Sequence, residues 1–334
     1  MRIEIPDRVY AEGRILRVRR AWPPDARGLP LELVDDAGVI RGARTEGGEV
    51  RLFPPGTDPR LPGLACAVEE GAVVLSHRPG RRAVLRTADG SFVKVVRPGR
   101  AADVVAAARR GDRFATAFQV PRILASDDDS VTLSVVPGHD LHTPGPFSPD
   151  SWRGAWRAVL RAWLAVIAEP APPAAGPVHD HEAERAVLEQ WCCRADDAVP
   201  DPRRRQVCAA AAGALAGLGP ADRYPVIHRD LHDKQLFWHP ESGPGLIDLD
   251  TVCHGDPGVD LGNLRAHARW RAVQGLWSPR ESDEVRREVD DAARLAGIDH
   301  DRVIAYEHAT AARLACVYAF RPRWREAAVT NARH

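Results

Sequence analysis

The feature that most constrains this 334-residue chain is a stretch from residue 227 to 260, where acidic and amide side chains follow short apolar runs. Asp230 comes after one apolar pair, Gln235 lies five residues later, and Asp248 ends a second apolar run 13 residues beyond that. Phosphoryl transfer requires a positioned nucleophile and cations held against a triphosphate. We therefore predict that Asp230 is a general base for an acceptor hydroxyl and that Gln235 and Asp248 are oxygen ligands for Mg²⁺.

Three segments, read in order, resemble the family of aminoglycoside phosphotransferases and choline kinases, distant relatives of protein kinases. They are His228-x-Asp230-x-x-x-x-Gln235, the Ile-Asp segment 246–250, and the Gly-Asp-Pro segment 255–261. The resemblance implies an α+β, two-lobed, protein-kinase-like fold, with an antiparallel β N-lobe and a mainly helical C-lobe. It also implies that ATP and Mg²⁺ are used and that a hydroxyl group accepts the phosphoryl group.

The resemblance assigns the same roles to Asp230, Gln235 and Asp248, and it implies structural support from His228, Asp256 and Asp260. The family usually has Asn where this chain has Gln235, so the longer side chain binds the metal either directly or through water. Asp250, two residues after Asp248, either joins the metal site or caps the next turn.

Upstream, two successive hairpins are predicted from Val73 to Val96, with a turn at 88–90. Lys94 in the last of these strands is our candidate for gripping the α- and β-phosphates. The helix expected over 101–113 should carry an acidic partner for this lysine. Asp103 and Asp112 are the candidates, of which Asp103 is preferred, and an arrangement without such a pair is the alternative. The strand expected over 130–136 runs, by resemblance, into a hinge whose backbone contacts adenine, at Ser134, Val135 and Val136.

The 46 basic residues include only two lysines, Lys94 and Lys234. A lysine is a compact charge on a flexible stem, whereas arginine is a planar fork, so a phosphate-binding position can distinguish the two. Lys234 adjoins the metal amide, and it contacts either the γ-phosphate or a surface carboxylate.

The chain divides into three predicted parts: a β-rich N-terminal extension over 1–70, a nucleotide-binding N-lobe over 71–137, and a helical C-lobe over 138–334. In the extension, short apolar alternations at 14–18, 31–34 and 49–53 predict a small antiparallel sheet. This sheet is either a cap, as in maltokinase-like relatives, or packing for the N-lobe.

The partners and compartment follow from composition and from the short interval after Asp248. Acidic and basic residues are equal in number, at 46 each, so no overall field favours nucleic acid or membranes. The six cysteines lack metal or disulfide spacing, no apolar run could span a membrane, and a cytoplasmic protein is expected. The interval from 248 to 255 is too short for a peptide-docking activation segment, so the acceptor should be a small hydroxylated molecule.

The chemistry of the acceptor stays open at this point. A polycationic aminoglycoside would need acidic walls, for which Glu281, Asp283, Glu284 and Glu307 are candidates. Arginines 321, 323 and 325 favour a neutral or anionic acceptor instead. The function is thus phosphorylation of an aminoglycoside-like or other sugar-like acceptor, in antibiotic inactivation or self-resistance, with ATP or GTP as donor. There are two alternatives. The protein is a sugar kinase or amino-sugar kinase of primary metabolism, or it is a regulator that binds a nucleotide without catalysis.

Overall fold

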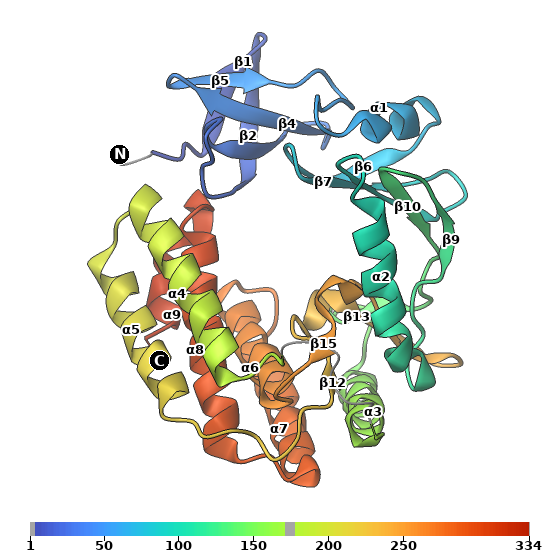
Figure 1. The fold of residues 1–334 in the computed structure, drawn as a ribbon, viewed down its shortest axis with the longest axis vertical. Coiled ribbons are helices and arrows are strands. Elements are labelled where there is room, and N and C mark those ends of the chain that lie inside the picture. The colour runs from blue at the N-terminus through green and yellow to red at the C-terminus, as the bar shows by residue number, and fades with distance from the viewer. Residues whose placement is uncertain (1–3, 171–177, 334) are drawn as a thin grey trace.

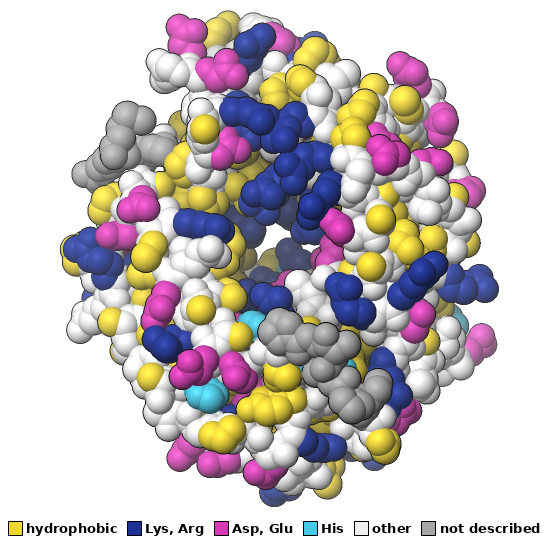
Figure 2. Space-filling model, in the orientation of Figure 1, with side chains coloured by type: hydrophobic (Ala, Val, Ile, Leu, Met, Phe, Trp, Pro, Cys, Tyr) yellow, Lys and Arg dark blue, Asp and Glu magenta, His cyan; other side chains and the backbone are white. Residues whose placement is uncertain are grey.

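A computed structural model describes residues 4–170 and 178–333. Its elements form three bodies (Figure 1), and the space-filling view shows a hollow between them (Figure 2). The first body is a five-stranded antiparallel sheet in sequential order, which we call the cap. Its strands are β1 (Arg8–Ala11), β2 (Arg14–Ala21), β3 (Pro30–Val34), β4 (Ile40–Glu46) and β5 (Glu49–Leu52).

The predicted alternations correspond to β2, β3 and β5, but β1 and β4 were missed. In β4, a Cβ atom on Gly42 would lie 2.5 Å from the ring of His77 in the N-lobe. The glycine is therefore required by a close approach between two bodies, although it weakens the strand pattern in the sequence.

The N-lobe is a second five-stranded antiparallel sheet, in the order β6-β7-β8-β10-β9. Its elements are β6 (Val73–Arg78), β7 (Arg82–Arg86), β8 (Phe92–Val96), α2 (Ala101–Gly111), η1 (Asp112–Thr116), β9 (Ile123–Ser126) and β10 (Ser130–Leu133). Helix α1 (Pro62–Glu69) precedes this sheet, and its Leu64 shares a buried cluster with Leu85 and Val95. Helix α1 therefore packs with the N-lobe, although it lies before residue 71.

The C-lobe is mainly helical. Its helices are α3 (Pro149–Ala168), α4 (His181–Ala198), α5 (Pro202–Ala216), α6 (Gly258–Val273), α7 (Pro279–Ala296), α8 (His300–Tyr318) and α9 (Arg325–Asn331), with η4 (Pro322–Trp324) between the last two. Short strands and 3₁₀ helices, labelled η, lie between the long helices: β11 (His139–Asp140), β12 (Val226–Ile227), η2 (Asp233–Gln235), β13 (Leu236–His239), β14 (Gly243–Leu246), η3 (Leu249–Thr251) and β15 (Cys253–His254). Trp152, Trp156 and Trp163 of α3 are buried in the core of this lobe.

Contacts close the three bodies into a ring. The cap meets the N-lobe where the backbone N–H of His77 donates to Glu32 (2.7 Å), and it meets the C-lobe where the N–H of Ala21 donates to the carbonyl of Phe320 (3.1 Å). The N-lobe meets the C-lobe through Lys94 and Asp250. Figure 2 shows the hollow that results, bordered by many Lys and Arg side chains. Within the described residues, no helix is long and apolar enough to cross a bilayer.

Candidate active site

The loop that carries Asp230 is held by the first turn of α6. Asp260 accepts hydrogen bonds from the backbone N–H groups of His228 (3.0 Å) and Arg229 (2.7 Å), and from the indole of Trp163 (3.0 Å). Arg229 adopts φ = 71°, a left-handed conformation that needs such support in a non-glycine residue. The structure therefore places Asp260 in the bracing position expected from the sequence.

His228 and Asp256 brace the same region from two other directions. His228 is buried, and its Nε2–H donates to the carbonyl of Ile247 (3.1 Å), which ties the loop of Asp230 to the loop of Asp248. Asp256 accepts from the N–H of Gly258 and from the hydroxyl of Tyr306, both at 2.9 Å, and it pairs with Arg302. Asp256 thus fixes the start of α6 against α8.

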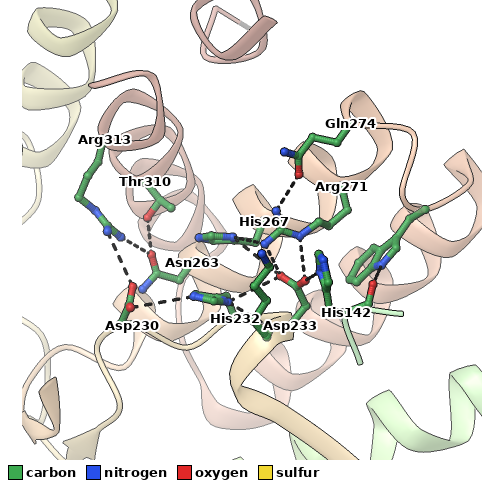
Figure 3. A network of polar contacts seen from close by, with 12 residues as sticks. His142, Asp230, His232, Asp233, Asn263, His267, Arg271, Gln274, Thr310 and Arg313 are labelled. Carbon is green, nitrogen blue, oxygen red and sulfur yellow. Dashed lines mark hydrogen bonds and ion pairs between the residues drawn. The ribbon is translucent and has the colours of Figure 1, made fainter. Parts of the chain in front are cut away.

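Asp230 projects from this loop into a polar network (Figure 3). Its side chain is 38% exposed, with Arg313 Nη1 at 3.8 Å from one carboxylate oxygen and His232 Nε2 at 4.0 Å from the other. Arg313 is held in turn by Asn263 (2.7 Å), whose amide also donates to the carbonyl of Arg229 (2.7 Å). A solvent-reachable carboxylate with fixed neighbours is suited to orient and deprotonate a hydroxyl group.

Gln235 and Asp248 are brought together by pairing of β13 with β14, and the backbone N–H of Ile247 donates to the carbonyl of Gln235 (3.0 Å). The side-chain oxygen of Gln235 is buried and has no hydrogen-bond partner among the described residues. A buried carbonyl oxygen without a donor suits a metal ion. Residues 235 and 248 therefore fit a Mg²⁺ site.

Asp248 has the charge that such a site requires. Partial burial raises the pKa of Asp248, but the nearby charges of Lys94 and Arg82 outweigh this effect and hold the pKa at about 2. The residue also has left-handed backbone, with φ = 60°. Asp248 is therefore ionised at neutral pH, in a conformation held by its surroundings.

Lys94 reaches this site from the N-lobe. The prediction that Asp103 is its acidic partner is wrong. Its ammonium group lies 2.6 Å from Asp250 and 3.3 Å from Asp248. Asp103 is exposed and pairs instead with Arg100 (2.7 Å), because the two are three residues apart in the first turn of α2. Asp250 thus forms an ion pair with Lys94 beside Asp248.

The remaining nucleotide candidates differ in their exposure. The N–H of Ser134 donates to the carbonyl of Arg122 (2.9 Å), Val135 is exposed and Val136 is buried. Lys234 is exposed, and among the described residues it forms no ion pair. Partial desolvation, and then the charge of Arg271, lower the pKa of Lys234.

Sequence reasoning assigned no role to a buried network beside Asp230. Asp233 accepts hydrogen bonds from Arg271 (2.8 and 3.0 Å) and contacts His142 (2.5 Å), while His232 stacks on His267 with ring centroids 4.4 Å apart. The ligand atoms of His232, Asp233 and His267 lie within 4.8 Å of one another, but Arg271 already supplies the cation that neutralises Asp233. The cluster is therefore an ion-pair network rather than a metal centre.

The two lobes and the site between them define a kinase-like phosphotransferase. The sequence model of the phosphotransferase enzyme family matches residues 74–306, and the chain belongs to this family. A search of curated proteins gave no significant match.

Solved structures share the fold. The aminoglycoside phosphotransferase APH(3'')-Id from Streptomyces rimosus is 23% identical, with 73% of this chain and 93% of that chain covered and a TM-score of 0.55. An aminoglycoside-3'-phosphotransferase of type VIII is 17% identical, with coverage of 75% and 98% and a TM-score of 0.53. The amicoumacin kinase hAmiN, solved with AMP-PNP, Ca²⁺ and Ami, is 13% identical, with coverage of 79% and 87% and a TM-score of 0.56.

Proposed function

We propose that this phosphotransferase moves the γ-phosphoryl group of ATP to a hydroxyl group of a small, sugar-like acceptor. The observation that carries the proposal is the convergence of Asp230, the unpartnered oxygen of Gln235 and the ionised Asp248 on two loops that His228 ties together. Lys94 faces these groups from the opposite lobe. The chain thus has, between its two lobes, a group suited to position the acceptor and groups suited to neutralise the phosphates.

In this mechanism Asp230 orients the acceptor hydroxyl group and removes its proton as the bond to phosphorus forms. Lys94 neutralises the α- and β-phosphates, Lys234 contacts the γ-phosphate, and the backbone of 134–136 contacts adenine. Gln235, Asp248 and Asp250 would hold Mg²⁺, which neutralises charge on the triphosphate when bound. ATP is the expected donor, with GTP as the alternative.

Two acceptor classes fit a family of this kind, an aminoglycoside-like antibiotic or a metabolic sugar. One observation favours a sugar or amino-sugar kinase over an enzyme that phosphorylates polycationic aminoglycosides. Of the carboxylates expected to line an acceptor pocket, Glu284 pairs with Arg153 and Glu307 with Arg265 (2.6 Å), while Glu281 caps its own helix. Paired carboxylates are poorly available to bind a cationic substrate.

The test is ADP release with ATP and Mg²⁺ against aminoglycosides, amino sugars and neutral sugars. We expect acceptor-stimulated turnover, and Asp230→Asn should lower kcat by about 10²–10⁴ while the melting temperature is unchanged. Turnover of Asp230→Asn within about tenfold of the parent contradicts the base assignment. Nucleotide binding without turnover for any acceptor would identify a non-catalytic regulator.

A further inference from the structure

The hollow is bordered by basic side chains from all three bodies (Figure 2). We call Arg20 of the cap, Arg78 and Arg82 of the N-lobe, and Lys234 and Arg321 of the C-lobe the basic rim. Desolvation, followed by neighbouring arginines, lowers the pKa of Arg78 to about 10. Desolvation also lowers the pKa of Arg20, Lys234 and Arg321, and the charge of Arg20 adds to the effect on the other two. Arg20 is therefore near Lys234 and Arg321, and Arg78 is near Arg82.

The fold places Arg20 and Arg321 beside each other. The backbone hydrogen bond from Ala21 to Phe320 (3.1 Å) joins the end of β2 to the end of α8, and each arginine adjoins one of these two residues. Arg321 lies over the ring of Tyr318, 4.6 Å from the centroid. The position of Arg321 is thus set by two fixed elements rather than by a free loop.

A chain of contacts connects Arg321 to the catalytic loop. The hydroxyl of Tyr318 accepts a hydrogen bond from Gln274 (3.4 Å), and the Gln274 carbonyl accepts from Arg271 (2.8 Å). Arg271 pairs with Asp233, which lies three residues after Asp230. Arg321 of the basic rim is therefore linked through side-chain contacts to the loop that carries the general base.

Few carboxylates compensate this charge. Glu32 is shared between Arg19 and Arg20, at 3.5 Å from each, and Asp250 is shared between Arg82 and Lys94. The Nε atom of Arg321 is buried and finds no hydrogen-bond partner among the described residues. A buried donor without an acceptor is costly, which favours a ligand that supplies one.

We propose that the acceptor carries an anionic group, a phosphate or a carboxylate, which binds Arg20 and Arg321 while its hydroxyl group faces Asp230. This inference rests on the proposed function and names the class of its acceptor. The rival source of negative charge is the nucleotide triphosphate, which Lys94 and the metal ligands already address. The two sources are separable, because they affect the KM of different substrates.

The experiment compares matched acceptors: glucose, glucosamine, glucuronic acid and glucose 6-phosphate, each with ATP and Mg²⁺. We expect kcat/KM to be at least about tenfold higher for one of the two anions than for glucose or glucosamine, because hydrogen bonds to charged groups contribute about that much. Preference for the phosphate or for the carboxylate identifies the anion. Equal or better turnover of the neutral or cationic sugar overturns the inference and leaves the proposed function intact.

Variants separate the acceptor from the nucleotide. Arg321→Met should raise the KM for the anionic acceptor about 10–100-fold and leave the KM for ATP within about threefold. Arg323→Met is the matched control, because Arg323 follows the same end of α8 but is exposed and stacks on Trp324 (4.7 Å). This variant should change neither the KM for the acceptor nor the KM for ATP. A rise in the KM for ATP alone assigns the rim to the nucleotide and overturns the proposal.

A binding measurement covers the case in which none of the four sugars is phosphorylated. With AMP-PNP and Mg²⁺ in the nucleotide site, titration calorimetry should detect glucose 6-phosphate or glucuronic acid binding to the parent and at least about tenfold weaker binding to Arg321→Met. Arg20→Met gives a second test if Arg321→Met lowers the melting temperature. Absence of binding by both anions, or equal binding by the parent and the variants, contradicts the inference.

Discussion

The ammonium group of Lys94 and the carboxylate of Asp250 lie 2.6 Å apart and join the two lobes across the opening. These residues are 156 positions apart in the chain, and Asp248 completes the cluster at 3.3 Å from the same nitrogen. Lys94, Asp248 and Asp250 therefore form a single charged centre between the lobes.

Replacing Lys94 by Met should raise the KM for ATP and lower kcat/KM by about 10–100-fold, because a charge-assisted contact to phosphate is lost. Lys94→Arg should not restore activity, since a planar fork does not fit where the compact ammonium group is buried. Steady-state kinetics with ATP varied checks this. Arg86→Met, on the exposed end of β7, is the control; an unchanged KM for ATP in Lys94→Met would contradict the role.

Gln235→Leu should raise the Mg²⁺ concentration needed for half-maximal activity by about tenfold or more, because an oxygen ligand or the partner of a metal-bound water is removed. Gln235→Asn keeps the oxygen and should have a smaller effect. A Mg²⁺ titration of ADP release in the parent and both variants measures this. Equal Mg²⁺ requirement in all three proteins would remove Gln235 from the metal site.

His232 should make the protein less stable as the pH falls from 6.5 to 4. Burial lowers the pKa of His232 to about 4, and an unfolded histidine titrates near 6.5, so the unfolded state binds more protons between these values. The stabilisation is complete above pH 6.5 and is lost towards pH 4, at a cost on the order of 3 kcal/mol. The pKa of His267 is also lowered, chiefly by burial, and it adds to the same window.

Urea unfolding at several pH values tests this, with His232→Asn expected to show a shallower loss of unfolding free energy between pH 6.5 and 4. The carboxylate of Asp248 titrates lower, below about pH 4, so its contribution falls outside the window. An identical pH dependence in the parent and the variant would show that His232 is not buried in its neutral form.

Gly262→Ala should destabilise the C-lobe, because a Cβ at this position would lie 2.5 Å from the Cβ of Tyr306 and 2.6 Å from its backbone carbon. Helices α6 and α8 would have to separate, at a cost of about 1–3 kcal/mol. Gly213→Ala in α5 meets no atom within 4 Å, and it should stabilise by about 0.5–1 kcal/mol through helix propensity. Thermal unfolding of both variants measures the contrast; a stable Gly262→Ala protein would contradict the close packing.

The elements and loops whose signals lie in neighbouring residues were predicted from the sequence. Strand β8 and its turn, and the loop from His228 to Gln235, carry their signals within a few residues of one another. The partner of Lys94 was missed because Asp103 satisfies Arg100 locally, while the carboxylates that reach the lysine come from the other lobe.

Contacts between distant segments gave no local signal. The hydrogen bond of Ala21 to Phe320 spans nearly the whole chain, and Arg313 approaches Asp230 only because α8 packs against α6. The network of His232, Asp233 and Arg271 was missed for the same reason. Its signal would have been a buried acidic residue next to the catalytic loop that requires a basic partner.

The backbone link between β2 and the end of α8 means that the cap, the N-lobe and the C-lobe each contact the other two. Two lobes that are joined only at a hinge can open by rotation about that hinge. In this molecule such a rotation would break the backbone hydrogen bond between Ala21 and Phe320 or bend the cap. Substrate exchange is therefore expected through the hollow that Figure 2 shows, with little change in the separation of the lobes. Molecules wider than this hollow would be excluded by geometry alone, whatever their charge.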